Sequence, residues 1–243
     1  DKYKVREYVQ SLGLGDTLVK LYGRWDKASD IDWDRLPNQF VLKVNNGCGD
    51  ILICRDKDKL DKATVIDTYD RLVSIKYGDV TGEPHYARIQ PCVIAEELLD
   101  INKQSINTSS LIDYKVWCLN GKPYCIWCAW NRGKEGADTG VYDLDWNYHP
   151  EWSVFTEHYR QGKEILPKPK CFERMLEVAS KLSEEFPILR VDLYEVNEKI
   201  YFGELTFTSL GGFMDYLTSE VLLDMGSKVR INEISEEYAH VKC

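Results

Sequence analysis

The sequence predicts an α+β protein made of antiparallel strand pairs and a few amphipathic helices. Two observations indicate this. Short apolar runs are joined in pairs by glycine or asparagine turns, and apolar residues recur at helical spacing elsewhere. With 243 residues, 44% of them hydrophobic, the chain can bury a sizeable core, either as one large domain or as two small lobes.

The overall charge and hydropathy exclude some classes of protein. A formal net charge of -9 argues against a nucleic-acid-binding face, which needs a surplus of clustered Lys and Arg. No apolar run approaches the roughly 20 residues that span a bilayer, and the N-terminus lacks the apolar region of a signal peptide. We therefore expect a cytoplasmic protein without a membrane span. Because the chain starts without Met and directly in a helical pattern, we also expect it to be part of a longer polypeptide.

The elements of the first half follow in order. Residues 2–13 predict a helix that ends at Gly13, and residues 40–44 and 51–54 predict two strands around a polar glycine loop. A helix is expected over residues 59–76 and a buried strand within residues 91–99. The polar segment 102–110 has turn composition and could be a mobile loop.

The second half begins with strands over residues 113–119 and 123–130, joined by Asn120 and Gly121, which is a strong hairpin signal. Residues 132–169 show no clear period and are expected to be irregular structure that covers a site. Their aromatic residues could stack on a sugar, although packing is the expected use: Tyr142, Trp146, Tyr148 and Trp152. A helix over residues 172–186, a hairpin over residues 190–206 and a closing helix from residue 215 complete the prediction.

The eight cysteines are interpreted as thiols, because most of them lie in apolar or strand-like segments. Cys125 and Cys128 have the spacing of a zinc or redox motif. There is no second such pair and no His pair to complete a zinc site, and the segment reads as a strand. Packing is therefore the expected role. The isolated residues His85, His149 and His158 are likewise expected to be structural or surface residues.

The 190–206 hairpin carries charged residues among apolar ones. A three-residue turn at 197–199 would pair residue 196 with residue 200, which places Asp192 opposite Glu204 and Arg190 opposite Thr206. Two facing carboxylates repel unless a cation lies between them, so the pattern fits either a metal site or solvated charges balanced by Arg190. A two-residue turn would put the carboxylates on opposite faces. The other face would pack on the helix with Val191, Leu193, Tyr201, Gly203 and Leu205.

Three further segments carry weaker signals. Gly47 and Gly49 can turn backbone N–H groups toward an anion above Lys43, in a loop that is neither a Walker A loop nor a dinucleotide fingerprint. Glu96 and Glu97 end an apolar strand, where a carboxylate and strand-end backbone could read a purine edge, or the glutamates could simply be solvated. In the third segment, alternation points Asp113 and Lys115 to one side of a strand, and Arg132 follows the next strand. Surface salt bridges would explain those three residues equally well.

Taken in order, these segments resemble the ATP-grasp superfamily. More narrowly, DKYKVREYV, FVLKVNNGCG, IAEELL, DYKVWCLNGKP and RVDLYEVNEKIYFGELTFTSLGGF look like the TupA-like ATP-grasp family, named for teichuronopeptide synthesis. The resemblance covers nearly the whole chain and implies the ATP-grasp fold, with two α+β lobes whose antiparallel sheets grip ATP between them. It implies one ATP-grasp domain over 1–243. Residues 20–98 would form a small glycine-loop lobe, and residues 1–19 and 99–243 a larger lobe with the metal site.

The resemblance also implies roles for the charged residues of the larger lobe. Asp192 and Glu204 would hold magnesium, with two ions expected on the ATP phosphates, and Arg190 would steady the γ-phosphate. Thr206 stands where many ATP-grasp enzymes have a metal-binding Asn, and Ser209 stands where Pro is frequent.

The remaining roles concern ATP and the acyl phosphate. Lys2 and Lys43 match phosphate-contacting lysines, and Arg132 matches a cation near the acyl phosphate. The other matched positions are the glycine loop that covers the phosphates (Gly47, Cys48, Gly49), the adenine hinge (Glu96, Glu97, Leu99), and a strand that faces ribose and phosphates (Asp113, Lys115).

The function implied is that of an ATP-dependent ligase that joins a carboxylate to an amine through an acyl phosphate. The family association points to amidation of a uronic acid in capsule or cell-envelope polysaccharide biosynthesis. The expected partners are a small-molecule or sugar-nucleotide carboxylate, an amine, and other domains of a longer polypeptide. Two alternatives remain open: a phosphotransferase that acts on a hydroxyl, and a non-catalytic nucleotide-binding module of a larger polysaccharide-synthesis protein.

Overall fold

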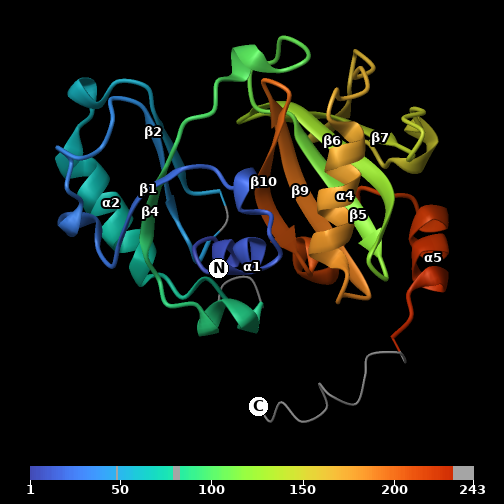
Figure 1. Ribbon diagram of the computed structural model, residues 1–243, viewed down its shortest axis with the longest axis horizontal. Helices are drawn as coiled ribbons and strands as arrows, with labels where there is room; N and C mark the ends of the chain where they lie inside the picture. Colours follow the sequence, from blue (N-terminus) through green and yellow to red (C-terminus); the bar gives the residue numbers. More distant parts are fainter. Residues whose placement is uncertain (48, 79–82, 232–243) are drawn as a thin grey trace. The chain divides into compact units, whose positions relative to one another are not determined.

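A computed structural model describes residues 1–47, 49–78 and 83–231 of the chain (Figure 1). The chain divides into two compact units, Asp1–Leu99 and Asp100–Cys243. Both units combine a sheet with helices, as the sequence predicts.

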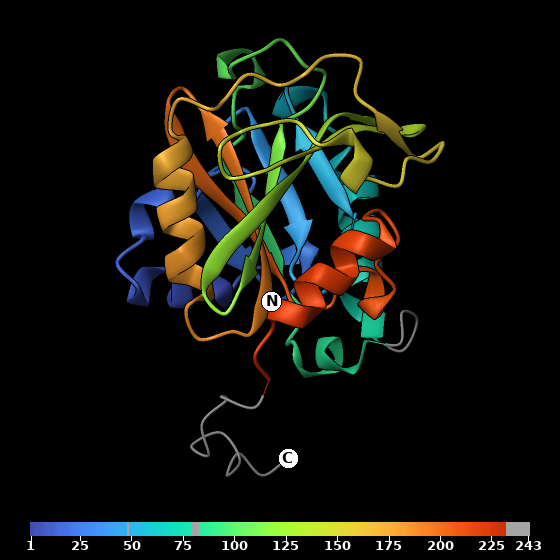
Figure 2. The ribbon, with the colours of Figure 1, turned by 90° about the vertical axis from the view of Figure 1, so that its right-hand side faces the viewer.

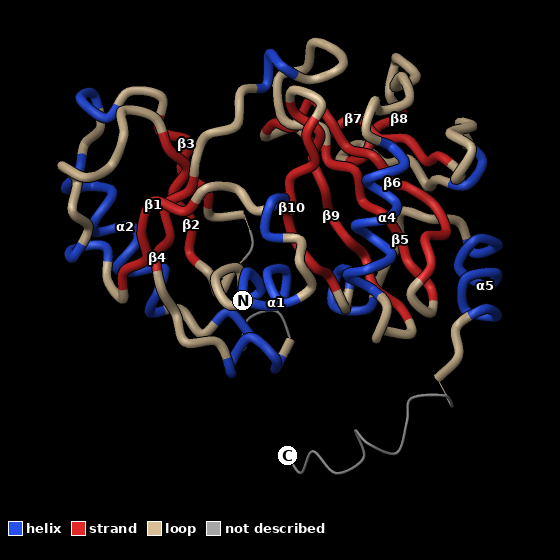
Figure 3. Tube along the Cα trace, in the orientation of Figure 1, coloured by secondary structure: helices blue, strands red, loops and turns tan. Residues whose placement is uncertain are grey.

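The described part of the first unit contains α1 (Val5–Ser11), α2 (Lys62–Ser74) and the strands β1 (Leu21–Trp25), β2 (Phe40–Val44), β3 (Ile51–Cys54) and β4 (Val93–Glu96). The strands, red in Figure 3, form a sheet in the order β1-β4-β2-β3, and every neighbouring pair is antiparallel.

One face of this sheet packs on α2. Phe40, Leu42 and Val44 of β2 are buried and form a core with Val65 and Tyr69 of α2. The Tyr69 hydroxyl donates to the Leu42 carbonyl at 2.9 Å, and burial raises the pKa of Tyr69 to about 12. Because side chains alternate along a strand, the opposite face of the sheet carries Lys43 of β2 and Glu96 of β4.

The described part of the second unit contains α4 (Phe172–Ser183), α5 (Ser219–Lys228) and the strands β5 (Asp113–Leu119), β6 (Lys122–Gly133), β7 (Gly136–Tyr142), β8 (Tyr159–Gln161), β9 (Ile188–Val196) and β10 (Lys199–Thr206). These strands form a sheet in the order β10-β9-β5-β6-β7-β8. Every neighbouring pair is antiparallel except β7 and β8, which are parallel.

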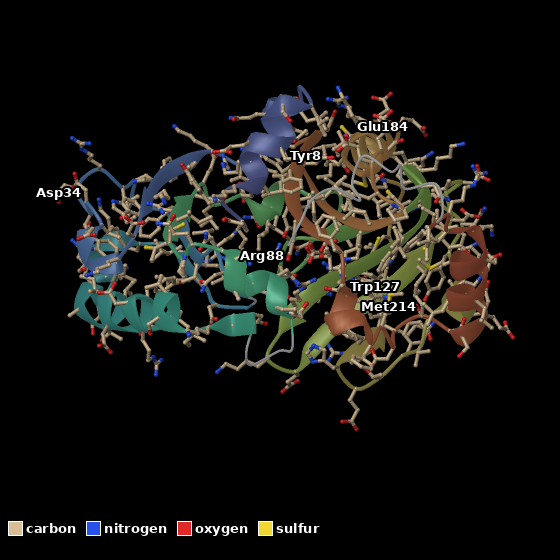
Figure 4. All side chains as sticks on the ribbon, turned by 90° about the horizontal axis from the view of Figure 1, so that it is seen from below. Tyr8, Asp34, Arg88, Trp127, Glu184 and Met214 are labelled. Carbon is tan, nitrogen blue, oxygen red and sulfur yellow. The ribbon has the colours of Figure 1, made fainter. Side chains whose placement is uncertain are left out.

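Helices cover different parts of the two faces of the second sheet. On one face, α4 (orange in Figure 2) packs against β5, β6 and β9, where Val116 and Val191 are fully buried. On the other face, Trp127 of β6 joins a core cluster with Val221 of α5 and the adjoining Met214; Trp127 and Met214 are labelled in Figure 4. The same face carries the charged residues of β5, β9 and β10, which are described below.

The predicted strands over residues 40–44, 51–54 and 113–119 match the structure residue for residue. The turn after β5 is the predicted hairpin, with Asn120 at φ 50° and Gly121 at φ 75°. The helices α1, α2 and α4 lie inside their predicted ranges, and the closing helix α5 begins at Ser219, four residues later than expected.

The interpretation of residues 132–169 as irregular is wrong in part, because β7 and β8 lie within it. The segment of β7, GADTGVY, lacks an alternation of large apolar residues because small residues fill most of its buried positions. Strand β1 was not predicted either. In this region Tyr142 and Trp146 stack at 4.3 Å, and Trp146 contacts Phe172 edge-on, which is the packing role expected for these aromatic residues.

The polar segment 102–110 is organised by Gln104. Its Oε1 accepts from Ile112 N at 2.6 Å, and its Nε2 donates to Thr108 Oγ1 at 3.0 Å and to the Ser110 carbonyl at 3.1 Å. The polar side chains that give this segment its turn composition therefore supply hydrogen bonds within it.

The described cysteines are free thiols: Cys54, Cys92, Cys118, Cys125, Cys128 and Cys171. Cys125 and Cys128 lie on β6 and are fully buried, and burial raises the pKa of both thiols. Both side chains therefore pack in the interior of the second unit, as expected. Across the described ranges, no helix combines the length and apolarity needed to cross a bilayer.

Candidate functional site

The hairpin of β9 and β10 brings Asp192 and Glu204 opposite each other, although its turn differs from the predicted one. Val196 pairs with Lys199, so the turn has two residues rather than three; Asn197 and Glu198 have φ values of 54° and 57°. The register then shifts between Phe202 and Glu204, where Gly203 forms a bulge. The predicted three-residue turn is wrong, and the predicted pairs at the far end of the hairpin are confirmed.

The bulge also changes which residues face the core. Ile200 and Phe202 are buried between the turn and the bulge, in place of the predicted Tyr201 and Gly203. Tyr201 instead pairs with Tyr194 on the charged face. Beyond the bulge, Leu205 pairs with buried Val191 as expected.

Asp192 lies at the centre of a group of charged residues that we call the Asp192 cluster: Asp113, Lys115, Arg132, Arg190 and Asp192. Its side chain is 2% exposed; Arg190 Nε donates to Oδ1 at 2.7 Å and Arg190 Nη2 to Oδ2 at 2.8 Å. Lys115 Nζ forms an ion pair with Oδ2. Burial by itself would raise the pKa of Asp192, but the charges of Arg190 and Lys115 outweigh it and lower the pKa.

Asp113 holds the other end of the cluster. Lys115 Nζ lies 3.4 Å from Asp113 Oδ2, and Arg132 forms an ion pair with the same oxygen. The other oxygen, Oδ1, is buried and has no hydrogen-bond partner in the described part of the chain. Cations therefore alternate with carboxylates, which keeps two buried carboxylates on adjacent strands compatible with folding.

Arg190 uses all its donors on protein acceptors. Besides Asp192, Nη1 donates to Ser209 Oγ at 2.9 Å and to Tyr216 OH at 3.3 Å, and Nη2 donates to Thr206 Oγ1 at 3.0 Å. The Ser209 and Tyr216 hydroxyls are themselves 2.9 Å apart. Arg190 thus links both carboxylate strands to the segment after β10. Tyr216 is not predicted from the sequence, because it follows the hairpin at no recognisable spacing.

Two further residues lie on the charged face, Glu204 of β10 and Tyr194 of β9. Glu204 is partly exposed, and among the described residues it has no ion-pair partner. Tyr194 continues the alternation of Arg190 and Asp192 along β9, and this two-residue spacing is the sequence signal that indicates it. The charge of Asp113, then burial and Asp192, raise the pKa of Tyr194, so its hydroxyl stays protonated and can donate.

In the first unit, Glu96 is held by two cations in what we call the Glu96 cluster: Arg6, Lys43 and Glu96. Lys43 Nζ lies 2.8 Å from Oε2, and Arg6 Nη1 lies 3.0 Å from Oε1. Lys43 and Glu96 come from the adjacent strands β2 and β4, whereas Arg6 comes from α1. Arg6 is not predicted from the sequence, because it lies 90 residues from Glu96 along the chain.

The glycine loop after β2 is anchored by Asn45. The Asn45 amide donates to Asp1 Oδ1 and to the Gln90 carbonyl, both at 3.0 Å, and its Oδ1 accepts from Cys92 N at 2.7 Å. Lys2 Nζ donates to the Gly47 carbonyl, which places this predicted site residue at the loop.

Gly49 of the loop has φ 88°, which favours glycine, and a side chain added there would meet no atom within 4 Å. Cys48, also predicted for this loop, lies outside the described residues.

The end of β4 has unpaired backbone groups. Glu97 N donates to the Lys20 carbonyl at 2.9 Å, but no described residue hydrogen-bonds to the Glu97 carbonyl or to the Leu99 N–H. Within the described residues, one acceptor and one donor, two residues apart, are thus left without a protein partner. In the whole described part of the chain, no group of three or more His, Cys, Asp or Glu residues is arranged to hold a metal ion.

Comparison with known proteins agrees with this architecture. The family model described as TupA-like ATPgrasp matches residues 1–230. No curated protein matches the chain. Among solved structures, the D-alanine–D-alanine ligase of Bacillus anthracis aligns with 94% of this chain and 66% of its own, at a TM-score of 0.54 and 15% identity.

Two other solved structures also align with 94% of this chain. They are the D-alanine–D-alanine ligase of Helicobacter pylori (57% of that chain, TM-score 0.47, 13% identity) and the ATP-grasp ligase PsnB complexed with a minimal precursor, Mg and ADP (60% of that chain, TM-score 0.45, 9% identity). The chain thus spans less than two thirds of the length of each of these ligases.

The two sheets and their helices therefore have the ATP-grasp fold, as the resemblance implied. Within this class, the chain belongs to the TupA-like ATP-grasp family, because the family model matches all but the last 13 of its 243 residues.

Proposed function

We propose that this chain is the ATP-binding part of a ligase that joins a carboxylate to an amine through an acyl phosphate. The observation that carries the proposal is the pairing of Asp192 with Glu204 beside Lys115 and Arg190, in a chain of the TupA-like ATP-grasp family. Clustered carboxylates and cations on one sheet face suit the positioning and neutralisation of transferring phosphoryl groups.

The first unit would bind the nucleotide. Lys43 and Lys2 would contact the phosphates, and the loop with Gly47 and Gly49 would cover them. The face of the sheet that carries Lys43 also carries Ile51 and Ile53, each 52% exposed. Such exposed apolar side chains suit the face of a purine ring.

The edge of adenine would be read by the backbone at the end of β4. The Glu97 carbonyl and the Leu99 N–H, which have no hydrogen-bond partner in the part of the chain that the structure describes, match the donor and acceptor pattern of an adenine edge. Glu96 would not act as a simple hydrogen-bond acceptor for adenine, because its two carboxylate oxygens already accept from Arg6 and Lys43.

The second unit would hold magnesium with Asp192 and Glu204. Their chemistry fits this ion, since magnesium is bound through one or two carboxylates together with substrate phosphates. Glu204 is partly exposed and has no ion-pair partner among the described residues, as an open ligand position requires. Thr206 could contribute its hydroxyl, which now accepts from Arg190. When bound, the ion would neutralise charge on the phosphates.

The chemistry has two steps. A carboxylate oxygen of the substrate attacks the γ-phosphorus of ATP, and ADP leaves, giving an acyl phosphate. An amine nitrogen then attacks the acyl carbon and loses a proton, and inorganic phosphate leaves. Lys115 and Arg132 would offset the charge on the transferring group, with Asp113 fixing both cations. Arg190 would steady the γ-phosphate only by releasing one of its present acceptors, so its first role is to position Asp192 and Thr206.

The substrate class follows from the family association alone. A uronic acid or another sugar carboxylate would be amidated in capsule or cell-envelope polysaccharide biosynthesis, in the cytoplasm. Other domains of a longer polypeptide would complete the carboxylate site, which is consistent with the fraction of the D-alanine–D-alanine ligase chain that this chain covers.

The test is calorimetric titration of a non-hydrolysable ATP analogue with and without magnesium. The wild type is compared with the double variant Asp192→Asn, Glu204→Gln, and with a matched control at exposed positions, Asp145→Asn, Glu220→Gln. We expect magnesium-dependent binding that the double variant loses and the control keeps. Failure of the wild type to bind nucleotide would overturn the proposal.

A second measurement separates a ligase from a phosphotransferase. ADP release is followed with candidate acceptors added singly and in pairs. A ligase requires a carboxylate and an amine for amide formation, whereas a phosphotransferase releases ADP with a hydroxyl acceptor alone.

A further inference from the structure

The Glu96 cluster places one carboxylate between two cations from different elements. The Glu96 side chain is 10% exposed, Arg6 is 15% exposed and Lys43 is 26% exposed. These two cations are the charged groups that reach the carboxylate within the described part of the chain. On the strands that pair with β4, Leu21 of β1 and Val41 of β2 lie opposite Glu96 and carry no charge.

The two cations are held differently. Arg6 is fixed at a second point, because its Nη2 donates to the Val19 carbonyl at 2.7 Å. Lys43 Nζ has Glu96 as its hydrogen-bond partner in the described residues, and its side chain is the more exposed of the two. A lysine is also the more mobile cation, with a point charge on a four-carbon chain. Lys43 is therefore the partner that can leave Glu96.

The departure of Lys43 would be unfavourable without Arg6. A buried carboxylate that loses its only counter-charge pays a desolvation cost or takes up a proton. With Arg6 in place, Glu96 keeps one ion pair and one set of charged hydrogen bonds when Lys43 turns to another anion. The first helix would in this way contribute to the nucleotide site without touching the nucleotide.

We propose that Arg6 is a positioning residue, which keeps Glu96 paired with a cation while Lys43 exchanges that carboxylate for a nucleotide phosphate. This rests on the proposed function in one respect, namely the contact of Lys43 with ATP. In the absence of nucleotide, Glu96 forms an ion pair with Lys43. When nucleotide binds, Lys43 can leave without leaving the Glu96 carboxylate unpaired, because the ion pair with Arg6 remains.

The test is a double-mutant cycle on binding of the ATP analogue with magnesium, using Arg6→Gln, Glu96→Gln and the combined variant. We expect Arg6→Gln to weaken binding roughly tenfold, a modest coupling for a partly buried ion pair. In the Glu96→Gln background the same substitution should change affinity less than about twofold, since no charge remains to balance. Arg6→Lys should restore part of the loss. Arg35→Gln, at an exposed ion pair of the same unit, is the control and should bind as the wild type.

A second readout separates this role from a structural one. Titration in two buffers of different ionisation enthalpy gives the number of protons taken up on binding. Arg6→Gln should take up a proton that the wild type does not, and the combined variant should lose this uptake. Equal losses of affinity in both backgrounds, or unchanged binding by Arg6→Gln, would overturn the inference while the proposed function stands. If the wild type binds no nucleotide, both the inference and the proposed function fail. Titration of the wild type alone identifies that case.

Discussion

Asp192 and Glu204 lie directly opposite each other on β9 and β10 because Gly203 adds one unpaired residue to β10. The two-residue turn at Asn197 and Glu198 would otherwise place the two carboxylates on opposite faces of the sheet. A bulge of one residue reverses the alternation, so the strand presents apolar residues to the core near the turn and Glu204 to the charged face beyond it.

Gly203→Ala should therefore disturb the charged face. A Cβ there would lie 2.9 Å from the Tyr194 ring and 3.0 Å from the Asp192 carbonyl, closer than ordinary contact. We expect a loss of about 1–3 kcal/mol in the free energy of unfolding, together with weaker magnesium-dependent nucleotide binding. Gly226→Ala in α5 is the control, since a Cβ there meets nothing within 4 Å. That variant should be neutral or slightly more stable in denaturant unfolding, and equal losses in both would contradict this account of the bulge.

The two opposed carboxylates should differ in their effect on stability. Asp192→Asn leaves Arg190 and Lys115 buried without their shared counter-charge, and we expect a loss of roughly 3 kcal/mol. Glu204→Gln removes a partly exposed charge that no described cation balances, so stability should change by less than about 0.5 kcal/mol. Urea unfolding of both single variants without nucleotide measures this difference. A larger loss for Glu204→Gln would show that Glu204 has a structural partner.

Arg190→Lys should not act as a conservative substitution. The guanidinium reaches Asp192, Thr206, Ser209 and Tyr216 at once, and a lysine ammonium cannot span these acceptors. We expect a loss of about 2 kcal/mol in unfolding free energy from the missing hydrogen bonds to buried acceptors. Arg160→Lys is the matched control, because Arg160 is 42% exposed and its ion pair with Asp138 is long, at 3.5 Å. Equal stability of the two variants would contradict this role of Arg190.

His149 should make stability depend on pH. Burial alone would lower its pKa, but hydrogen bonds to Glu151 (2.7 Å) and Asp143 (3.1 Å) outweigh burial and raise the pKa. A raised pKa contributes stability that is fully present below the unfolded value of about 6.5 and is lost as the pH rises through the folded value. His149→Gln should thus cost roughly 0.5 kcal/mol more at pH 5.5 than at pH 8.5, a small figure because the pair is partly exposed. Thermal unfolding at both pH values measures it, and Glu151→Gln should reduce the difference.

Much of the fold follows from local sequence patterns, in which residues close together in the chain decide whether a segment forms a strand, a turn or a helix. The alternation of residues 40–44, the turn at Asn120 and Gly121, and the helical spacing of residues 172–183 depend only on backbone geometry and burial of one face. The same alternation placed Arg190 with Asp192, and Asp113 with Lys115, on common faces.

Sequence alone identified the residue types and the order of the segments, and so the family to which the chain belongs. Tertiary structure decided the rest. The bulge at Gly203, the contact of Arg6 with Glu96 across 90 residues, and the hydrogen bonds of Arg190 to Ser209 and Tyr216 all join segments whose spacing carries no periodic signal. The physical reason is that a buried charge must find its counter-charge wherever the folded chain brings one within hydrogen-bond distance, and that distance is set by packing.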